Sequence, residues 1–222
     1  MNFLNLLIKS VKFLIFPPKC VFCDSLNTDV FCYECKTQII NSFRPHIIKT
    51  QQPLVCASGL VYSRLVQNSI KNFKFRNQVN ISNILSNFMA STVKSCFKYE
   101  KFDYVTYVPM YKDNSKSYNQ SEILAKKVSK ILQFPFEICL KKTKKNKVQR
   151  GLNFQERQLN VKGVYKSVKS LKNKKILLCD DVVTTGATLS ECVKELSKSG
   201  AKVICVTAAY TEKNNSLNGN SS

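Results

Sequence analysis

The chain has 222 residues, and 44% of them are hydrophobic. This content is sufficient for a hydrophobic core and excludes a chain that is too polar to fold. We expect one principal domain with a small additional module. The 35 basic and 14 acidic residues give a formal net charge of +21, which would attract a polyanion such as nucleic acid. Only five of the basic residues are arginine, and lysine and asparagine are abundant throughout, so a compositional bias explains the same charge and leaves DNA binding open.

Residues 1–17 are predicted to form an amphipathic helix that ends at the Pro17-Pro18 pair. Its apolar side chains are interrupted by Lys9 and Lys12, and its apolar length is too short to span a membrane. No small-residue cleavage site follows, as a secretory signal would require. We therefore predict no transmembrane segment and a cytoplasmic protein, with this helix packed on the body of the protein. Adsorption of the helix to a membrane surface is the alternative.

Two CxxC pairs come next, separated by eight residues, and their members are Cys20, Cys23, Cys32 and Cys35. Four thiolates at this spacing predict a closed tetrahedral site for a structural Zn²⁺, with no open position for a catalytic water. The competing interpretations are disulfides, which suit secreted proteins, and a redox CxxC, which needs no second copy. We favour zinc and predict a module over 18–45 whose folding depends on the metal.

Apolar periodicity predicts alternating strands and helices after this module. We expect strands at 57–62 and 104–108, helices at 64–73, 79–97 and 121–132, and a lysine-rich loop at 141–150. Six of the ten residues in that loop are basic. The segment 109–120 joins a strand to a helix N-terminus, and such a junction is an anion site by geometry.

The run 174–192 carries the strongest motif of the chain. Residues 176–179 are continuously apolar, as in a parallel strand covered on both faces. Asp180 and Asp181 follow at its carboxyl end, where open α/β sheets bind ligands. A turn of small residues and hydroxyls at 184–188 then suits a phosphate at the start of a helix. Carboxylates beside such a turn are suited to accept hydrogen bonds from vicinal ribose hydroxyls.

The same unit continues with a helix from Leu189, a left-handed cap at Gly200 and a second strand at 203–209, which predicts a right-handed parallel crossover. The turn lacks the Lys-Ser or Lys-Thr pair of a Walker-type nucleotide loop, and the glycines of a dinucleotide fingerprint are absent. A polar strand-to-helix turn in some other α/β protein is the remaining alternative.

This unit resembles the phosphoribosyl-pyrophosphate (PRPP) motif of the type I phosphoribosyltransferases, in which apolar residues, two acids and two further apolar residues precede Thr-Thr-Gly-Ala-Thr. The resemblance implies an α/β fold with a parallel sheet flanked by helices. It also implies that the acids bind the ribose 2′ and 3′ hydroxyls, that the turn holds the 5′-phosphate and that Mg²⁺ enters with the pyrophosphate. The implied PRPP-binding residues are Asp180, Asp181, Thr184, Thr185, Gly186, Ala187 and Thr188.

Further segments resemble the ComF family, the phosphoribosyltransferase-like proteins associated with bacterial competence for DNA uptake. The similar segments are Phe16-Pro17-Pro18 with the first CxxC, Tyr62 to Phe75, Asn119 to Glu122 and Gln149 to Gly163, so the resemblance covers about residues 14–211. Lys116-Ser117-Tyr118 stands where the family has Arg-Gly-Phe. The implied pyrophosphate or substrate contacts are Lys112, Lys116, Asn119, Gln120, Gln149, Arg157 and Asn160, the last three in a catalytic hood. A basic surface loop with an asparagine cap is the alternative for the segment before Asn119.

Together the motifs predict four parts: the N-terminal helix at 1–17, the zinc module at 18–45, the phosphoribosyltransferase-like domain at 46–211 and a disordered tail at 212–222. We favour a ComF-type protein that binds PRPP and acts in DNA uptake, in contact with single-stranded DNA. The alternatives are an active phosphoribosyltransferase with an unidentified small acceptor, and a structural partner of a competence helicase with a vestigial pocket. No residue is assigned a catalytic role, and whether the chain is an enzyme stays open.

Overall fold

The structure is a computed structural model. It describes residues 14, 17, 19–26, 31–50, 54–75, 80–111, 118–144 and 160–211. The predicted N-terminal helix and C-terminal tail therefore lie almost entirely outside the described residues, and the four-part division stays a prediction. In the described part of the chain, no helix is long and apolar enough to cross a membrane.

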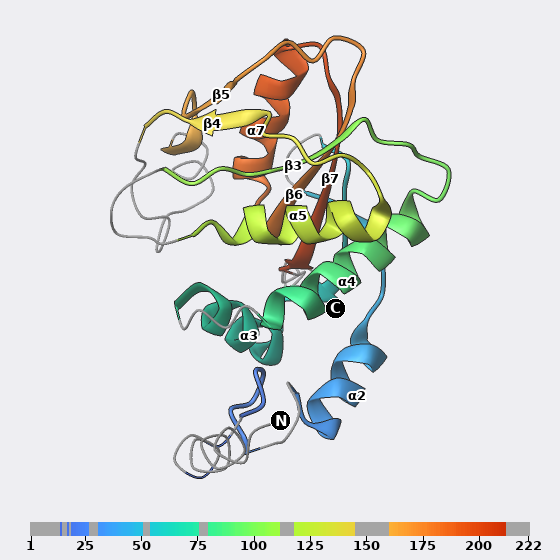
Figure 1. The fold of residues 1–222 in the computed structure, drawn as a ribbon, viewed down its shortest axis with the longest axis vertical. Helices are drawn as coiled ribbons and strands as arrows, with labels where there is room; N and C mark the ends of the chain where they lie inside the picture. The colour runs from blue at the N-terminus through green and yellow to red at the C-terminus, as the bar shows by residue number, and fades with distance from the viewer. Residues whose placement is uncertain are drawn as a thin grey trace, which may run out of the picture.

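A five-stranded sheet forms the centre of the molecule, and its strands lie in the order β1-β2-β7-β6-β3 (Figure 1). Their bounds are β1 His46–Ile48, β2 Cys56–Val61, β3 Tyr104–Tyr107, β6 Lys175–Val183 and β7 Lys202–Tyr210. All neighbours pair in parallel except β1, which pairs antiparallel to β2. The predicted α/β fold with a parallel sheet is confirmed, and the short strand β1 was not predicted.

Helices cover both faces of this sheet, as predicted. One face carries α3 (Arg64–Phe75), α4 (Asn80–Cys96) and α5 (Gln120–Leu132), and the other carries α7 (Ala187–Lys198). Alternate residues of β6 supply the two cores: Leu177 and Cys179 pack with the first set of helices, while Ile176 and Leu178 pack with α7. This two-sided burial explains why residues 176–179 are continuously apolar.

The junction between β3 and β6 is a topological switch point. After β3 the chain passes through α5 to Phe136, which forms a parallel bridge with Val105 on the side of β3 away from β6. After β6 it passes through α7 on the opposite face and returns as β7. The chain thus leaves these two neighbouring strands in opposite directions, and a crevice at their carboxyl ends is where open α/β sheets bind ligands.

The prediction of a lysine-rich loop at 141–150 is wrong for its first two residues. Lys141 and Lys142 belong to strand β4 (Leu140–Lys142), which pairs antiparallel with β5 (Tyr165–Ser167) to form a separate two-stranded ribbon. The partner strand lies more than twenty residues away in the chain, so local composition does not reveal this pairing. Residues 145–150 lie outside the described part.

The cysteine-rich segment shares the main core instead of forming a separate one. Helix α2 (Tyr33–Ser42) begins directly after Cys32, and Figure 1 shows it at the lower end of the molecule. The side chains of Cys20, Phe22 and Ile39 are buried in the same cluster as those of α3 and α4. The side-chain amide of Asn72 on α3 donates a hydrogen bond of 3.2 Å to the carbonyl of Val21. The segment is therefore anchored on α3.

Candidate functional site

Strand β6 extends four residues beyond the last pair that it forms with β3. The β3 register ends at Tyr107 opposite Cys179, whereas pairing with β7 continues to Val183. Asp180 and Asp181 thus lie within the strand and not after its end, which corrects the predicted strand bounds. The carboxylates bond the backbone beyond the last pair with β3: Asp180 Oδ1 accepts from the amide of Asp181 at 2.9 Å, and Asp181 Oδ1 accepts from that of Val182 at 2.8 Å.

The start of α5 supplies the next contact to the acid pair. Asn119 caps this helix, because its Oδ1 accepts from the amides of Ser121 and Glu122 and its Nδ2 donates to the carbonyl of Val108. The cap places the Ser121 hydroxyl 2.7 Å from Asp180 Oδ1, to which it donates. The segment Asn119 to Glu122, selected for its resemblance to the ComF family, therefore holds the end of β3 and one carboxylate together.

The predicted phosphate turn lies between β6 and α7. Gly186 has φ 82°, a left-handed conformation that favours glycine, and it precedes the first helical residue, Ala187. A Cβ atom at Gly186 would lie 3.2 Å from Thr50 Cβ, so the chain after β1 passes close to the turn. The Thr185 hydroxyl accepts from the amide of Ala187 at 3.4 Å. Glycine offers no side-chain oxygen to cap the helix, and a helix N-terminus without such a cap favours an anion.

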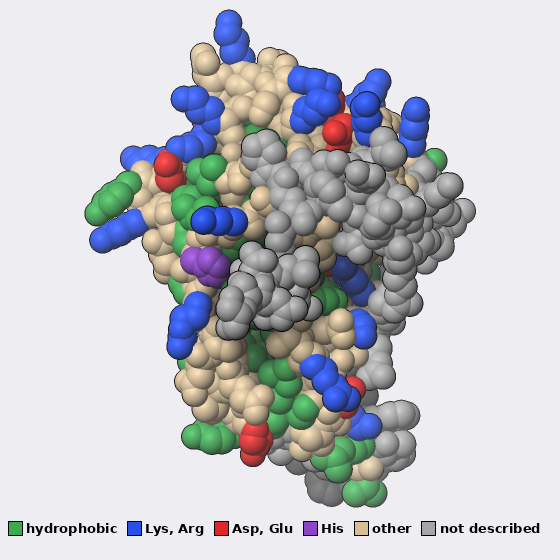
Figure 2. Space-filling model, turned by 180° about the vertical axis from the view of Figure 1, so that it is seen from behind, with side chains coloured by type: hydrophobic (Ala, Val, Ile, Leu, Met, Phe, Trp, Pro, Cys, Tyr) green, Lys and Arg blue, Asp and Glu red, His purple; other side chains and the backbone are tan. Residues whose placement is uncertain are grey.

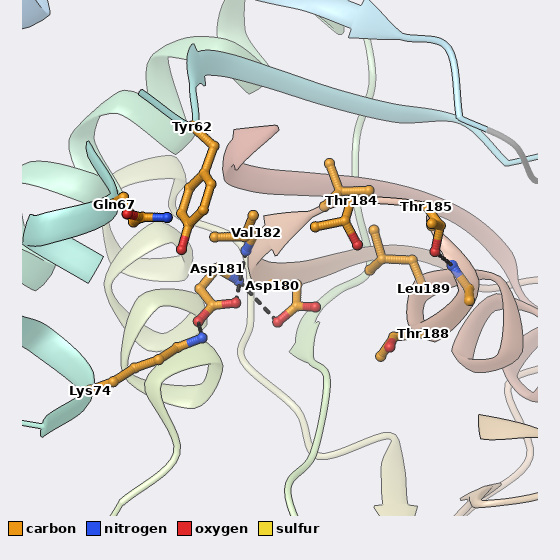
Figure 3. Close-up of a pocket in the computed structure, with 13 residues that line it drawn as sticks. Tyr62, Gln67, Lys74, Asp180, Asp181, Val182, Thr184, Thr185, Thr188 and Leu189 are labelled. Carbon is orange, nitrogen blue, oxygen red and sulfur yellow. Dashed lines mark hydrogen bonds and ion pairs between the residues drawn. The ribbon is translucent and has the colours of Figure 1, made fainter. Parts of the chain in front are cut away.

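The acid pair and the turn line one cavity of about 600 Å³ (Figure 3). All seven residues predicted to bind PRPP contribute to its wall. Figure 3 shows the threonines on one side of Asp180 and Asp181 and a second group of side chains on the other. That second group is Tyr62, Gln67 and Lys74, from the end of β2 and from α3.

These three residues were missed as site residues. Tyr62, the last residue of the predicted strand at 57–62, packs against the main core and also lines the cavity. The available signal was the resemblance of the stretch Tyr62 to Phe75 to the ComF family, which by itself does not say what the stretch touches. Apolar periodicity assigns this stretch to a helix. It does not reveal that the last turn of this helix contacts a strand that comes about one hundred residues later in the chain.

The electrostatics of the cavity depend on three charged groups. Lys74 Nζ forms an ion pair with Asp181 Oδ2. Burial, followed by the charge of Asp181, raises the pKa of Asp180 to about 7, although the hydrogen bond from Ser121 and the charge of Lys74 act in the opposite direction. A carboxyl group with such a raised pKa beside a phosphate turn is typical of a binding or catalytic site and unusual at a purely structural position.

The other predicted contacts lie outside this cavity or outside the described residues. Asn119 and Gln120 begin α5 and do not line the cavity, and neither does Asn160. The turn after Asn160 is attached to α7, because the amide of Gly163 donates to Glu191 Oε1 at 2.7 Å. The remaining candidates, Lys112, Lys116, Gln149 and Arg157, lie outside the described residues. Their roles stay predictions.

The four cysteines of the two CxxC pairs converge on one point. Their sulfur atoms all lie within 4.8 Å of one another, and Cys23 Sγ is 3.8 Å from Cys32 Sγ. A tetrahedral site with metal–sulfur bonds of about 2.3 Å requires sulfur separations of about 3.8 Å. All ten cysteines are free thiols, and three of these four are buried. The cluster can hold a metal ion, and its all-sulfur donor set fits zinc.

Known proteins share sequence similarity with this chain. The model of the phosphoribosyl transferase domain matches residues 119–218. Competence protein F of Haemophilus influenzae is 32% identical over 147 residues, which are 62% of this chain and 64% of that protein. DNA utilization protein YhgH of Escherichia coli is 26% identical over 107 residues, 47% of each chain. Orotate phosphoribosyltransferase of Helicobacter pylori is 38% identical over 55 residues, 25% of this chain and 27% of that enzyme.

The fold and the domain match define the class: this is an α/β protein with a parallel-dominated sheet, in which residues 119–218 are similar to the phosphoribosyl transferase domain. The resemblance to the ComF family is confirmed by the similarity to competence protein F together with the N-terminal cluster of four cysteines. In each of these comparisons the chain spans less than two thirds of the relative's own length.

Proposed function

We propose that the cavity binds PRPP. Asp180 and Asp181 accept hydrogen bonds from the ribose hydroxyls, and the turn from Thr184 to Thr188 receives the 5′-phosphate at the start of α7. The observation that carries this proposal is the arrangement of a carboxylate pair and a phosphate turn on the wall of one open cavity at the switch point of the sheet. Mg²⁺ would neutralise the pyrophosphate, held mainly by ligand oxygens, because this ion uses few protein ligands.

The four-cysteine cluster is proposed to hold a structural Zn²⁺. Cys20, Cys23, Cys32 and Cys35 supply a closed donor set with no position left for a reacting water. Since Cys20 and Phe22 belong to the main core, binding of the metal would stabilise the region around α3 as well as the segment itself.

At the level of the cell, the proposed role is in competence and DNA uptake, because one relative is named competence protein F and another is named DNA utilization protein YhgH. Contact with single-stranded DNA is the finer proposal. On the ribbon of β4 and β5, Lys141 lies directly opposite Lys166. Like charges in this register repel each other, and an anion between them would relieve the repulsion. A helicase partner stays a prediction.

The second candidate is an active transferase, in which an acceptor displaces pyrophosphate from C1 of the ribose. The cavity of about 600 Å³ has a size typical of small-molecule sites, which is consistent with this candidate. Release of pyrophosphate in the presence of candidate acceptors would distinguish a transferase from a protein that only binds PRPP.

The test of PRPP binding is calorimetric titration of the full chain with PRPP and Mg²⁺. The double variant Asp180→Asn with Asp181→Asn is expected to bind more than tenfold more weakly, a loss of about 1.4 kcal/mol or more, because charged acceptors are replaced by neutral ones. Asp103→Asn is the matched control, since Asp103 precedes β3 at the other end of the strands and bonds Lys174 and Lys175. Equal affinity of the double variant and the unchanged chain would refute the proposal.

A further inference from the structure

The cavity has two chemically different ends, with the acid pair between them. The phosphate turn from Thr184 to Thr188 forms one end, and Lys74, Gln67 and Tyr62 form the other (Figure 3). In a ribose 5-phosphate unit the 5′-phosphate and the substituent on C1 leave the ring at opposite ends, while the 2′ and 3′ hydroxyls lie between them. A ligand with its phosphate in the turn and its hydroxyls at the acids therefore directs its C1 substituent toward Lys74.

Lys74 is the only lysine or arginine among the described residues that line the cavity. Burial acts to lower its pKa, but the charges of Asp181 and Asp180 outweigh this effect and raise the pKa overall, so the ammonium group is charged at neutral pH. The helix turn that carries Lys74 is fixed from the side, because the Tyr118 hydroxyl donates to the carbonyl of Phe73. The lysine side chain itself keeps 36% of its surface exposed, which leaves it room to move.

Both carboxylate oxygens of Asp181 have partners within the protein. Its Oδ1 accepts from the amide of Val182, and its Oδ2 pairs with Lys74. A ribose hydroxyl that uses this carboxylate competes with the ammonium group for Oδ2. If the C1 substituent is neutral, the displaced ammonium group loses its counter-ion inside a partly buried cavity. If the substituent is anionic, the ammonium group gains a new partner a short distance away.

We propose that Lys74 is a specificity-determining residue that selects ligands with an anionic group on C1, by pairing with that group when the ribose hydroxyls take over Asp181. This inference rests on the proposed PRPP site. It also gives the ion pair between Lys74 and Asp181 a role, because Lys74 neutralises a carboxylate that the ribose hydroxyls of the ligand use. The corresponding class of ligand is a ribose 5-phosphate that carries a phosphate or pyrophosphate on C1.

The test compares two ligands on matched variants by calorimetry in the presence of Mg²⁺. PRPP carries pyrophosphate on C1, and ribose 5-phosphate carries only a hydroxyl group. Lys74→Met retains the length of the side chain without its charge, and is expected to weaken PRPP binding at least tenfold while changing ribose 5-phosphate binding less than about twofold. Lys74→Arg, which keeps a positive charge, is expected to keep most of the preference for PRPP over ribose 5-phosphate. Lys94→Met, at an exposed position of α4 outside the cavity, is expected to leave both affinities unchanged.

Three results would overturn this role. An equal loss for both ligands would show that Lys74 only positions Asp181. If Lys74→Met changes neither the affinity for PRPP nor that for ribose 5-phosphate, the ammonium group does not reach the substituent on C1. Binding of neither ligand by the unsubstituted chain would overturn the PRPP site itself, together with the role of Lys74. Thermal unfolding of each variant establishes that a loss of affinity does not arise from unfolding.

Discussion

The environment of Asp180 disfavours the charged form of its carboxyl group. Its carboxyl group lies beside that of Asp181, and burial together with this neighbouring charge raises its pKa to about 7. Its Oδ1 also receives the Ser121 hydroxyl and the amide of Asp181. Ionisation of Asp180 therefore costs folding free energy, and a cost of this kind is common where a group is needed for binding.

Asp180→Asn is expected to stabilise the fold at pH 8 more than at pH 5. The folded-state pKa near 7 lies above the ordinary value of 3.8, so the folded state binds the proton more tightly than the unfolded state. The stability that comes from this proton is fully present below about pH 4 and is lost as the pH rises toward 7. Asparagine does not titrate, and its side-chain oxygen still accepts from Ser121. Urea denaturation at the two pH values measures the difference.

Asp103→Asn is the control, because its effect on stability at pH 8 is expected to have the opposite sign. The hydrogen bond from the amide of Lys175 and the neighbouring Lys174 lower the pKa of Asp103, so its stabilisation is present at neutral pH and lost only in acid. This variant is expected to be less stable than the unsubstituted chain at pH 8. A loss of stability at pH 8 for Asp180→Asn would contradict the interpretation of its environment.

At the site, residues close together in the chain were predictable, and residues brought together by the fold were not. The acids and the turn lie within nine residues, so strand, turn and helix patterns identify them as one unit. Lys74 and Tyr62 reach the same cavity from another strand-to-helix connection, and which strand ends meet depends on the order of strands in the sheet. That order is a property of tertiary packing, which single-sequence periodicity does not contain.

At the scale of elements, the end of α3 is a junction between three parts of the molecule. Asn72 bonds the cysteine-rich segment at Val21, the carbonyl of Phe73 accepts from Tyr118 before α5, and Lys74 pairs with Asp181 on β6. Three successive residues thus connect the cysteine cluster, the segment before α5 and the cavity. A disturbance of the cysteine cluster is expected to reach the cavity along this helix turn.

Asn72→Ala is expected to loosen the cysteine-rich segment. Asn72 is buried, and its removal leaves the carbonyl of Val21 without this donor, at a cost of about 1–3 kcal/mol. We therefore expect a zinc-loaded chain with this substitution to lose metal to a chelator several times faster, as followed by a zinc-sensitive dye. Asn87→Ala is the control, because Asn87 is exposed and its side-chain amide donates to the carbonyl of Asn83 in its own helix. Equal rates for the two variants would show that the contact with α3 does not secure the metal segment.

The long helices and central strands followed from periodicity, whereas the short elements did not. Helices α4 and α5 were predicted to within about one residue at each end, because one face of each is apolar over several turns. Strands β1, β4 and β5 have three residues each, too few for a periodic pattern. Strand β6 was predicted too short, because its last residues alternate between buried and half-buried and include two acids.

At the scale of the whole molecule, the basic residues are distributed widely. Figure 2 shows Lys and Arg side chains scattered over the face drawn there, gathered at its upper end, while acidic side chains are sparse. Several described lysines have acidic partners, including Lys169 with Glu137 and Lys174 with Asp103. Net charge therefore does not identify a DNA-binding surface. A test of DNA binding has to compare the substitution of lysines in one defined position with the substitution of an equal number of lysines elsewhere.

The ribbon of β4 and β5 is such a position. If Lys141 and Lys166 on the ribbon and Lys144 just after β4 contact single-stranded DNA, their substitution by glutamine is expected to weaken binding and to reduce the slope of log K against log salt by roughly 0.7 for each phosphate that the variant no longer neutralises. The control removes three exposed lysines on the helices of the other face, namely Lys71, Lys94 and Lys130. Fluorescence anisotropy with labelled oligonucleotide at several salt concentrations measures both slopes. Equal losses of affinity in the two variants would show that binding follows net charge and not this ribbon, and retention of PRPP affinity in both would separate the DNA surface from the ribose-phosphate cavity.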